Sequence, residues 1–152
     1  MLLTDCDGVL TDTGVYYSAN GEELKRFSIR DGMGVERLKN HANVETGIIT
    51  GENSEIVKRR AEKLMITELH LGIKNKVETF YEILLRKNLK AEEVAYLGDD
   101  TNDLEIMKLA GLAACPADAT IFAQQVSDII LENRGGNGAL RDFAEIIIYC
   151  KN

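Results

Sequence analysis

The chain has 152 residues, a formal net charge of −7 and a sequence pI near 4.9. This length suits one domain, residues 1–152, that can bury a core without disulfides or structural metals. The acidic balance excludes a broad surface for nucleic acid or anionic membrane, since phosphates are bound there through clustered Lys and Arg. The three cysteines form no C-x-x-C pair and no apolar stretch could span a bilayer, so we expect a protein of the reducing cytoplasm.

Two carboxylates follow the first apolar run. Leu2 to Asp5 is typical of a buried strand, and Asp7 lies two residues beyond Asp5. Side chains alternate along a strand, so Asp5 and Asp7 project to the same side while Cys6 projects to the other. Asp and Gly are also common turn residues, and this segment by itself therefore fits both a turn and a reactive site.

The next segment, residues 14–28, predicts a β-hairpin. Two β-prone runs flank Asn20 and Gly21, and Asn-Gly between such runs is a strong hairpin signal. The hairpin would project over the strand ends. Because an isolated two-stranded flap is marginally stable, we expect it to pack against a neighbouring subunit.

From residue 31 onward, short apolar runs alternate with stretches of helical period, which predicts βαβ units. The clearest helix spans residues 74–88. The fold class is therefore a doubly wound α/β domain with a mostly parallel sheet. The expected strands are residues 2–5, 44–50, 68–71, 94–98, 112–115 and 128–131.

Several polar residues lie where these strands end or helices begin. Thr50 and Gly51 precede a helix expected from about residue 53, and helix N-termini hold anions. Lys76 begins the long helix, where a cation is disfavoured unless an anion lies near, although a lone surface lysine is also common there. Asp99, Asp100 and Asp103 follow the run 94–98. Parallel strands bring such ends to one crevice, which suits a hard divalent cation.

The order Asp-x-Asp, Thr, Lys, Gly-Asp-Asp-x-x-Asp resembles the haloacid dehalogenase superfamily along the whole chain. The resemblance implies that Asp5 attacks phosphorus and that Asp7 protonates the leaving group and then activates water. It assigns Thr50 to a phosphoryl oxygen and Lys76 to charge neutralisation. It places Mg²⁺ on the carboxylates of Asp5 and Asp99 and the backbone carbonyl of Asp7, with Asp100 and Asp103 supporting this site from behind.

Neither usual position of a cap domain carries an insertion. The chain therefore resembles the capless branch of sugar-acid phosphatases, and this resemblance implies a homotetramer whose active sites are completed by neighbouring subunits. Substrate contacts are expected from Gly51, Glu52, Arg60 and Lys63. Arg60 lies on the apolar stripe of its helix, where it either reaches solvent or meets an anion such as a substrate carboxylate.

The residues after Thr50 bear on the substrate. Glu52 and Lys63 resemble phosphatases of nine-carbon acids, which implies 2-keto-3-deoxy-D-glycero-D-galacto-nononate 9-phosphate, a sialic-acid-type substrate. The alternative is 3-deoxy-D-manno-octulosonate 8-phosphate. A second alternative, from another class, is a non-catalytic oligomerisation or regulatory module. A signalling receiver domain is disfavoured, because it places its adjacent acid pair first and its phosphorylated Asp in mid-chain.

Overall fold

The computed structural model describes residues 1–151, which form one six-stranded sheet and a separate two-stranded hairpin. The sheet order is β5-β4-β1-β6-β7-β8, and each adjacent pair is parallel. The doubly wound fold predicted from the sequence is therefore confirmed. The strands of this sheet are β1 (Leu2–Thr4), β4 (Thr46–Ile49), β5 (Glu68–His70), β6 (Ala95–Leu97), β7 (Leu112–Cys115) and β8 (Ile129–Ile130).

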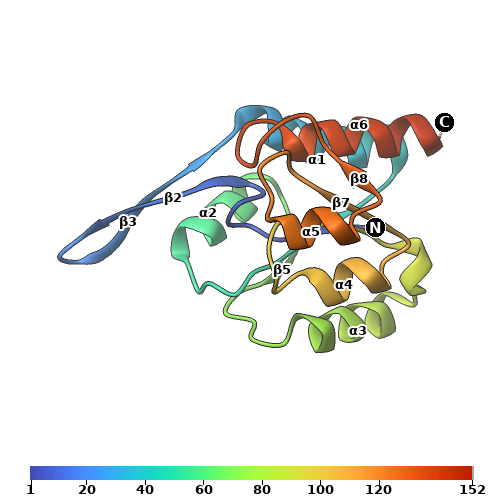
Figure 1. Cartoon of the computed structure of the whole chain (residues 1–152), viewed down its shortest axis with the longest axis horizontal. Coiled ribbons are helices and arrows are strands. Elements are labelled where there is room, and N and C mark those ends of the chain that lie inside the picture. Colours follow the sequence, from blue (N-terminus) through green and yellow to red (C-terminus); the bar gives the residue numbers. More distant parts are fainter. Residues whose placement is uncertain (152) are drawn as a thin grey trace.

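Helices cover both faces of the sheet (Figure 1). One face packs against α1 (Ile29–Ala42), α2 (Glu55–Lys63) and α6 (Ala139–Lys151). The other packs against α3 (Lys76–Lys87), α4 (Leu104–Leu109) and α5 (Ile121–Val126), and a short 3-10 helix, η1 (Ala91–Glu93), precedes β6. No helix within residues 1–151 is long and apolar enough to cross a membrane.

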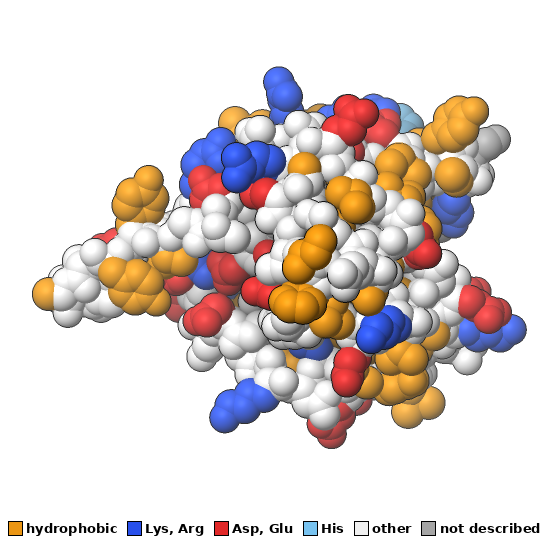
Figure 2. Space-filling view, viewed as in Figure 1, with side chains coloured by type: hydrophobic (Ala, Val, Ile, Leu, Met, Phe, Trp, Pro, Cys, Tyr) orange, Lys and Arg blue, Asp and Glu red, His pale blue; other side chains and the backbone are white. Residues whose placement is uncertain are grey.

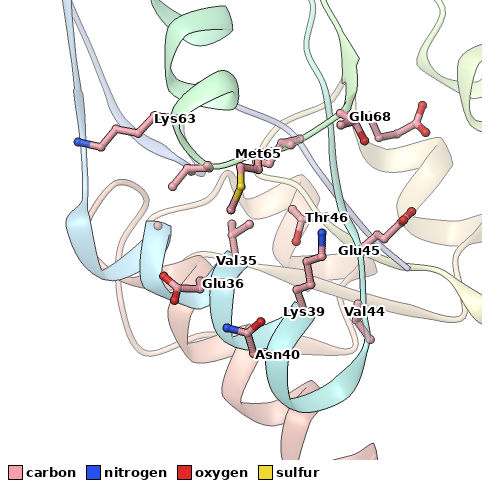
Figure 3. Close-up of a pocket in the computed structure, with 14 residues that line it drawn as sticks. Val35, Glu36, Lys39, Asn40, Val44, Glu45, Thr46, Lys63, Met65 and Glu68 are labelled. Atoms are coloured by element: carbon pink, nitrogen blue, oxygen red, sulfur yellow. The ribbon is translucent and has the colours of Figure 1, made fainter.

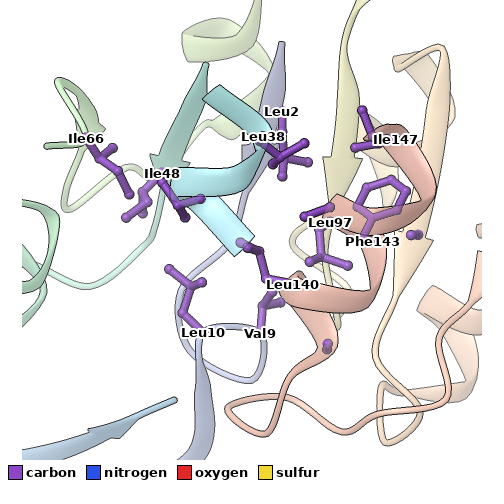
Figure 4. Close-up of a cluster of buried hydrophobic side chains, with 14 of the residues drawn as sticks. Leu2, Val9, Leu10, Leu38, Ile48, Ile66, Leu97, Leu140, Phe143 and Ile147 are labelled. Carbon is purple, nitrogen blue, oxygen red and sulfur yellow. The ribbon is translucent and has the colours of Figure 1, made fainter. Parts of the chain in front are cut away.

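Strand periodicity divides the core into two layers. Leu2 and Ile48 join the cluster beneath α1, α2 and α6, which is drawn in Figure 4, whereas their neighbours Leu3 and Ile49 join the cluster on the opposite face. Because both faces are covered, successive strand residues can all be apolar, and this accounts for the continuous apolar runs in the sequence.

The hairpin consists of β2 (Thr11–Ser18) and β3 (Gly21–Phe27) and projects from the body of the domain (Figure 1). Its prediction is confirmed, with Gly21 at a φ of 107° after the turn. Along it, Val15, Tyr16, Tyr17 and Leu24 are exposed, and Figure 2 shows hydrophobic side chains over the projecting part. This surface lacks an apolar partner within the described chain.

The chain crosses over beside β1. It runs from β1 to β4 and β5 on one side, then returns to β6, β7 and β8 on the other. In open α/β sheets such a change of direction leaves a crevice outside the carboxyl ends of the strands. The carboxyl ends of β1 and β6 are level, since Thr4 pairs with Leu97.

Candidate functional site

The predicted catalytic residues gather at this crevice. Asp5 follows β1, Thr50 follows β4 and Asp99 comes shortly after β6. The backbone N–H of Asp5 donates to the carbonyl of Leu97 at 3.0 Å, which ties the first acidic loop to the strand that precedes Asp99. All three residues are buried, although their polar side chains are not needed to pack the hydrophobic core.

Lys76 provides a positive charge beside the first carboxylate. It is the first residue of α3, and Asn75 caps this helix by accepting a hydrogen bond from the N–H of Glu78. The Lys76 ammonium lies 2.9 Å from Asp5 Oδ1 and 2.8 Å from Asp103 Oδ1, with 3% of its side chain exposed. Burial alone would lower the pKa of Lys76, but the charges of Asp5 and Asp103 outweigh burial and raise it. Lys76 is therefore held as a cation against the helix dipole.

Asp103 organises the acidic loop after β6. Its Oδ1 accepts hydrogen bonds from Lys76 Nζ and from the hydroxyl of Tyr96, which lies in β6. Its Oδ2 accepts from the backbone N–H groups of Asp99 and Asp100. Asp100, by contrast, is exposed and accepts from the adjacent N–H of Thr101. The two acids therefore differ: Asp103 shapes the loop and Asp100 lies at the surface.

The remaining carboxylates fit a hard divalent cation. One carboxylate oxygen from each of Asp5, Asp99 and Asp103 lies within 4.8 Å of the others. Both oxygens of Asp103 already accept hydrogen bonds, whereas Asp99 Oδ1 is buried without a hydrogen-bond partner among residues 1–151. Mg²⁺ prefers such oxygens. Asp5 and Asp99, the ligands expected from the sequence, are thus both in this cluster and could hold such an ion.

The raised pKa values of Asp5 and Asp99 also favour a cation at this site. Burial, followed by the charge of Asp103, raises the pKa of Asp5 to about 7, against the opposing effect of Lys76. Burial and the charges of Asp5 and Asp103 raise the pKa of Asp99 to about 8. Because both pKa values are raised, a further positive charge is needed to stabilise both carboxylates in their ionised form.

Gly8 allows the two acidic loops to meet. Its φ is 89°, and a Cβ at this position would lie 1.9 Å from Asp99 Oδ2. Any side chain here would therefore displace the Asp99 carboxylate as well as strain the backbone. The glycine after the Asp-x-Asp pair is a requirement of the site, in addition to being a turn residue.

Lys25 is a site residue that the sequence prediction missed. It lies on β3 of the hairpin, yet its ammonium is 2.7 Å from Asp7 Oδ1 and 3.1 Å from Glu22 Oε1. Burial opposes its charge, but hydrogen bonds to Asp7 and Glu22 outweigh burial and raise its pKa. The available signal was strand alternation, which puts Lys25 on the same face as Phe27, two residues further along β3.

The expected substrate-binding residues fall into two groups. Gly51 and Glu52 are exposed beside Thr50, and the N–H of Glu52 donates to the Thr50 hydroxyl at 3.3 Å. Arg60 instead points toward the hairpin base: its Nη2 donates to the carbonyl of Ser28 at 2.8 Å, and its guanidinium lies 5.5 Å from the centre of the Phe27 ring. Among residues 1–151, Arg60 meets a carbonyl and an aromatic ring rather than an anion.

Lys63 ends α2 and lies beside a cavity of about 290 Å³ between α1, α2 and the starts of β4 and β5 (Figure 3). Thr46 and Glu68, the first residues of β4 and β5, also line this cavity. It therefore lies toward the amino ends of these strands, whereas the catalytic residues lie at their carboxyl ends. Within one chain, Lys63 is not brought to the carboxylates.

The sequence of this chain is similar to that of known hydrolases. The family model of haloacid dehalogenase-like hydrolases matches residues 36–141. The 3-deoxy-D-manno-octulosonate 8-phosphate phosphatase of Haemophilus influenzae is 36% identical over 147 residues, which cover 97% of this chain and 81% of that protein. The enzyme of the same name from Escherichia coli K12 is 38% identical over 148 residues, 97% of this chain and 78% of that protein.

Solved structures show the same likeness. A 3-deoxy-D-manno-octulosonate 8-phosphate phosphatase from Moraxella catarrhalis, in complex with magnesium ion, phosphate ion and a KDO molecule, has a TM-score of 0.95 at 33% identity, covering 99% of this chain and 86% of that one. A cobalt-bound structure from Haemophilus influenzae has a TM-score of 0.94 at 35% identity, covering 99% and 87%. Residues 1–151 form the sheet, its helices and the hairpin, and none of them forms a cap domain.

Proposed function

The chain belongs to the haloacid dehalogenase-like hydrolases, and from this premise we propose that it is a Mg²⁺-dependent phosphatase of a 3-deoxy-2-keto sugar acid phosphate. The observation that carries the proposal is the buried arrangement of Asp5, Lys76 and Asp99 at the carboxyl end of the sheet. Phosphoryl transfer needs alignment and positive charge more than elaborate covalent chemistry. An acidic protein supplies that charge locally, through Lys76 and a metal ion.

In this mechanism Asp5 attacks phosphorus and takes the phosphoryl group as an aspartyl phosphate. Asp7 protonates the leaving oxygen and afterwards removes a proton from the attacking water. Lys76 offsets the charge on Asp5 and on the phosphoryl oxygens, and Thr50 donates its hydroxyl to one of them. Mg²⁺, held by Asp5, Asp99 and the backbone carbonyl of Asp7, would supply charge neutralisation for the phosphoryl group.

For the substrate we propose 3-deoxy-D-manno-octulosonate 8-phosphate. The support is the set of relatives above, which carry this substrate in their names. The eight-carbon acid therefore replaces the nine-carbon acid as the expected substrate. Glu52 remains the specific observation in favour of 2-keto-3-deoxy-D-glycero-D-galacto-nononate 9-phosphate, because it lies exposed beside Thr50, where a polyol chain would extend from the phosphate.

Arg60 and Lys63 would contact substrate across a subunit boundary. Both lie in the last turn of α2, and at about 1.5 Å of rise per residue Lys63 is about 12 Å from Glu55, the first residue of this helix. We therefore place them in the active site of a neighbouring subunit in a homotetramer. The exposed apolar hairpin is the surface for that assembly. With Cys6, Cys115 and Cys150 all unpaired, we place the enzyme in the reducing cytoplasm.

The test is phosphate release from the eight-carbon acid, the nine-carbon acid and a hexose phosphate, each with Mg²⁺ and with EDTA. Preference for the eight-carbon acid supports the proposal. Preference for the nine-carbon acid would contradict the proposed substrate but not the proposed reaction. Glu52→Arg should then reduce that preference. The absence of Mg²⁺-dependent release from all three would favour a non-catalytic module.

A further inference from the structure

Lys25 joins the hairpin to Asp7, the acid–base residue of the proposed reaction. Its side chain is 1% exposed, although β3 belongs to a hairpin that is mostly exposed to solvent. The ammonium contacts Asp7 at 2.7 Å and Glu22 at 3.1 Å. Burying a lysine is costly unless it is paired, so a buried lysine on an exposed flap needs an explanation beyond the stability of the strand.

The two oxygens of Asp7 are in different situations. Asp7 Oδ1 accepts from Lys25 Nζ, and Thr11 Oγ1 lies 3.5 Å from the same oxygen. Asp7 Oδ2 is buried and has no hydrogen-bond partner within residues 1–151. One oxygen is therefore held by Lys25, and the other has no hydrogen-bond partner among the described residues.

Lys25 is itself held in place from its far side. Glu22 contacts Lys25 with Oε1 and accepts a hydrogen bond from the hydroxyl of Ser54 with Oε2. Ser54 is the N-cap of α2, directly after the loop that begins at Thr50. A continuous polar chain thus runs from Asp7 through Lys25 and Glu22 to the start of α2, and it restricts where the Lys25 ammonium can lie.

We propose that Lys25 is a positioning residue that fixes the Asp7 carboxyl group for proton transfer to the leaving oxygen. The inference rests on the proposed function and deepens it, because it assigns the orientation of the general acid to the hairpin. With Oδ1 held by Lys25, the proton that Asp7 donates is carried on Oδ2. A general acid must reach hydrogen-bond distance of the atom it protonates, and a fixed rotamer provides this.

An oxygen of Asp5 forms a bond to phosphorus while the bond from phosphorus to the leaving oxygen breaks, and that oxygen keeps the electron pair. The proton on Asp7 Oδ2 moves to the leaving oxygen, and Lys25 stays bonded to Oδ1 as Asp7 becomes an anion. Water then attacks phosphorus, its proton returns to Asp7, and the bond between Asp5 and phosphorus breaks to release phosphate.

The dependence of kcat/KM on the leaving group distinguishes a lysine that positions the general acid from one that only supports the fold. An alkoxide leaves poorly without a proton, whereas 4-nitrophenolate leaves without one. We would measure kcat/KM, which reports the steps up to phosphorylation of Asp5 and so excludes the later attack of water. The substrates are octulosonate 8-phosphate, phenyl phosphate and 4-nitrophenyl phosphate. The two aryl esters keep the test valid even when the sugar acid proves to be the wrong substrate.

The variant is Lys25→Met, with Lys25→Arg as the conservative replacement. The matched control is Arg26→Met, since Arg26 is the next residue of β3 and pairs with Asp12 instead of Asp7. We expect Lys25→Met to lose on the order of 100-fold in kcat/KM for the sugar acid, less for phenyl phosphate and under about threefold for 4-nitrophenyl phosphate. Lys25→Arg should recover part of the loss, and Arg26→Met should change kcat/KM by the same factor for all three substrates.

Equal losses on all substrates, or no loss, would overturn the proposal and leave Lys25 as a support of the hairpin. Should Lys25→Met fail to fold by circular dichroism, the double variant Glu22→Gln/Lys25→Met takes its place, because it removes one of the two carboxylates left unpaired. A wild-type enzyme that hydrolyses aryl phosphates but no sugar acid would contradict the proposed substrate, and the comparison of the aryl esters would still decide the role of Lys25.

Discussion

At the scale of single residues, the site brings together more negative charge than it neutralises. Asp5 and Asp99 face each other as buried carboxylates, and the Lys76 ammonium is shared between Asp5 and Asp103. Asp103 accepts hydrogen bonds from Lys76 and the loop, Lys76 lies beside Asp5, and Asp99 keeps one oxygen without a partner among residues 1–151. The arrangement is completed by a cation, which explains how an acidic chain can handle a phosphate ester.

Gly8→Ala tests how closely the two acidic loops must approach. The new Cβ would lie 1.9 Å from Asp99 Oδ2, so the carboxylate must leave its position. We expect Mg²⁺-dependent turnover to fall by on the order of 100-fold, as misplacement of a catalytic group by about 1 Å can do. The measurement is kcat together with the Mg²⁺ concentration needed for half-maximal activity.

Gly21→Ala is the matched control for this prediction. Gly21 also has a positive φ, of 107°, but a Cβ there would meet nothing within 4 Å. It should cost about 1 kcal/mol of stability and leave the Mg²⁺ requirement unchanged. If both alanine variants behaved alike, backbone strain rather than contact with Asp99 would explain the requirement for Gly8.

At the scale of elements, Glu68 joins β5 to α3. Its carboxylate, at the buried start of β5, accepts hydrogen bonds from Arg86 of α3 and from His70. Burial alone would raise the pKa of Glu68, but these partners outweigh burial and lower it below the usual 4.5. The stabilisation is therefore present above pH 4.5 and is lost as the pH falls through the lowered pKa of the folded protein.

Glu68→Gln should destabilise the fold at neutral pH by about 1 kcal/mol, and the difference from wild type should shrink below about pH 4. Urea unfolding at a series of pH values measures this. Glu62→Gln is the control, since Glu62 pairs with Arg59 at the exposed surface and should change stability by under about 0.5 kcal/mol. A Glu68→Gln difference that grew on acidification would show the sign to be wrong.

The elements were predictable where hydrophobic pattern alone decides them. The apolar runs ending at Asp5, Thr50 and Gly98 indicated strands and placed their polar ends together, because parallel strands share one carboxyl edge. Lys25 was missed although strand alternation puts it on the same face as Phe27, because a charged residue on a hairpin is typical of a solvated face. Asp103 and Asp100 were both expected to support the site, but the difference between them was hidden, because it depends on Tyr96 and Lys76 converging on one oxygen of Asp103 through tertiary packing.

At the scale of the whole molecule, the hairpin leaves apolar surface without a partner in the described chain. We expect Leu24→Asp to split the proposed homotetramer into smaller species, because it would bury an unpaired charge at the interface. Light scattering coupled to size-exclusion chromatography measures this. Asn20→Asp adds the same charge at an exposed polar position of the turn and should leave the assembly intact. A monomeric wild-type protein would contradict the assembly.

The most direct test is Mg²⁺-dependent phosphate release by wild type and by Asp5→Asn, with both proteins checked for folding. We expect wild type to release phosphate from the sugar acid with Mg²⁺ and to stop with EDTA. Asp5→Asn, which keeps the shape but cannot form the aspartyl phosphate, should lose at least about 1,000-fold of the activity. Turnover that persisted in folded Asp5→Asn would contradict the claim that Asp5 receives the phosphoryl group.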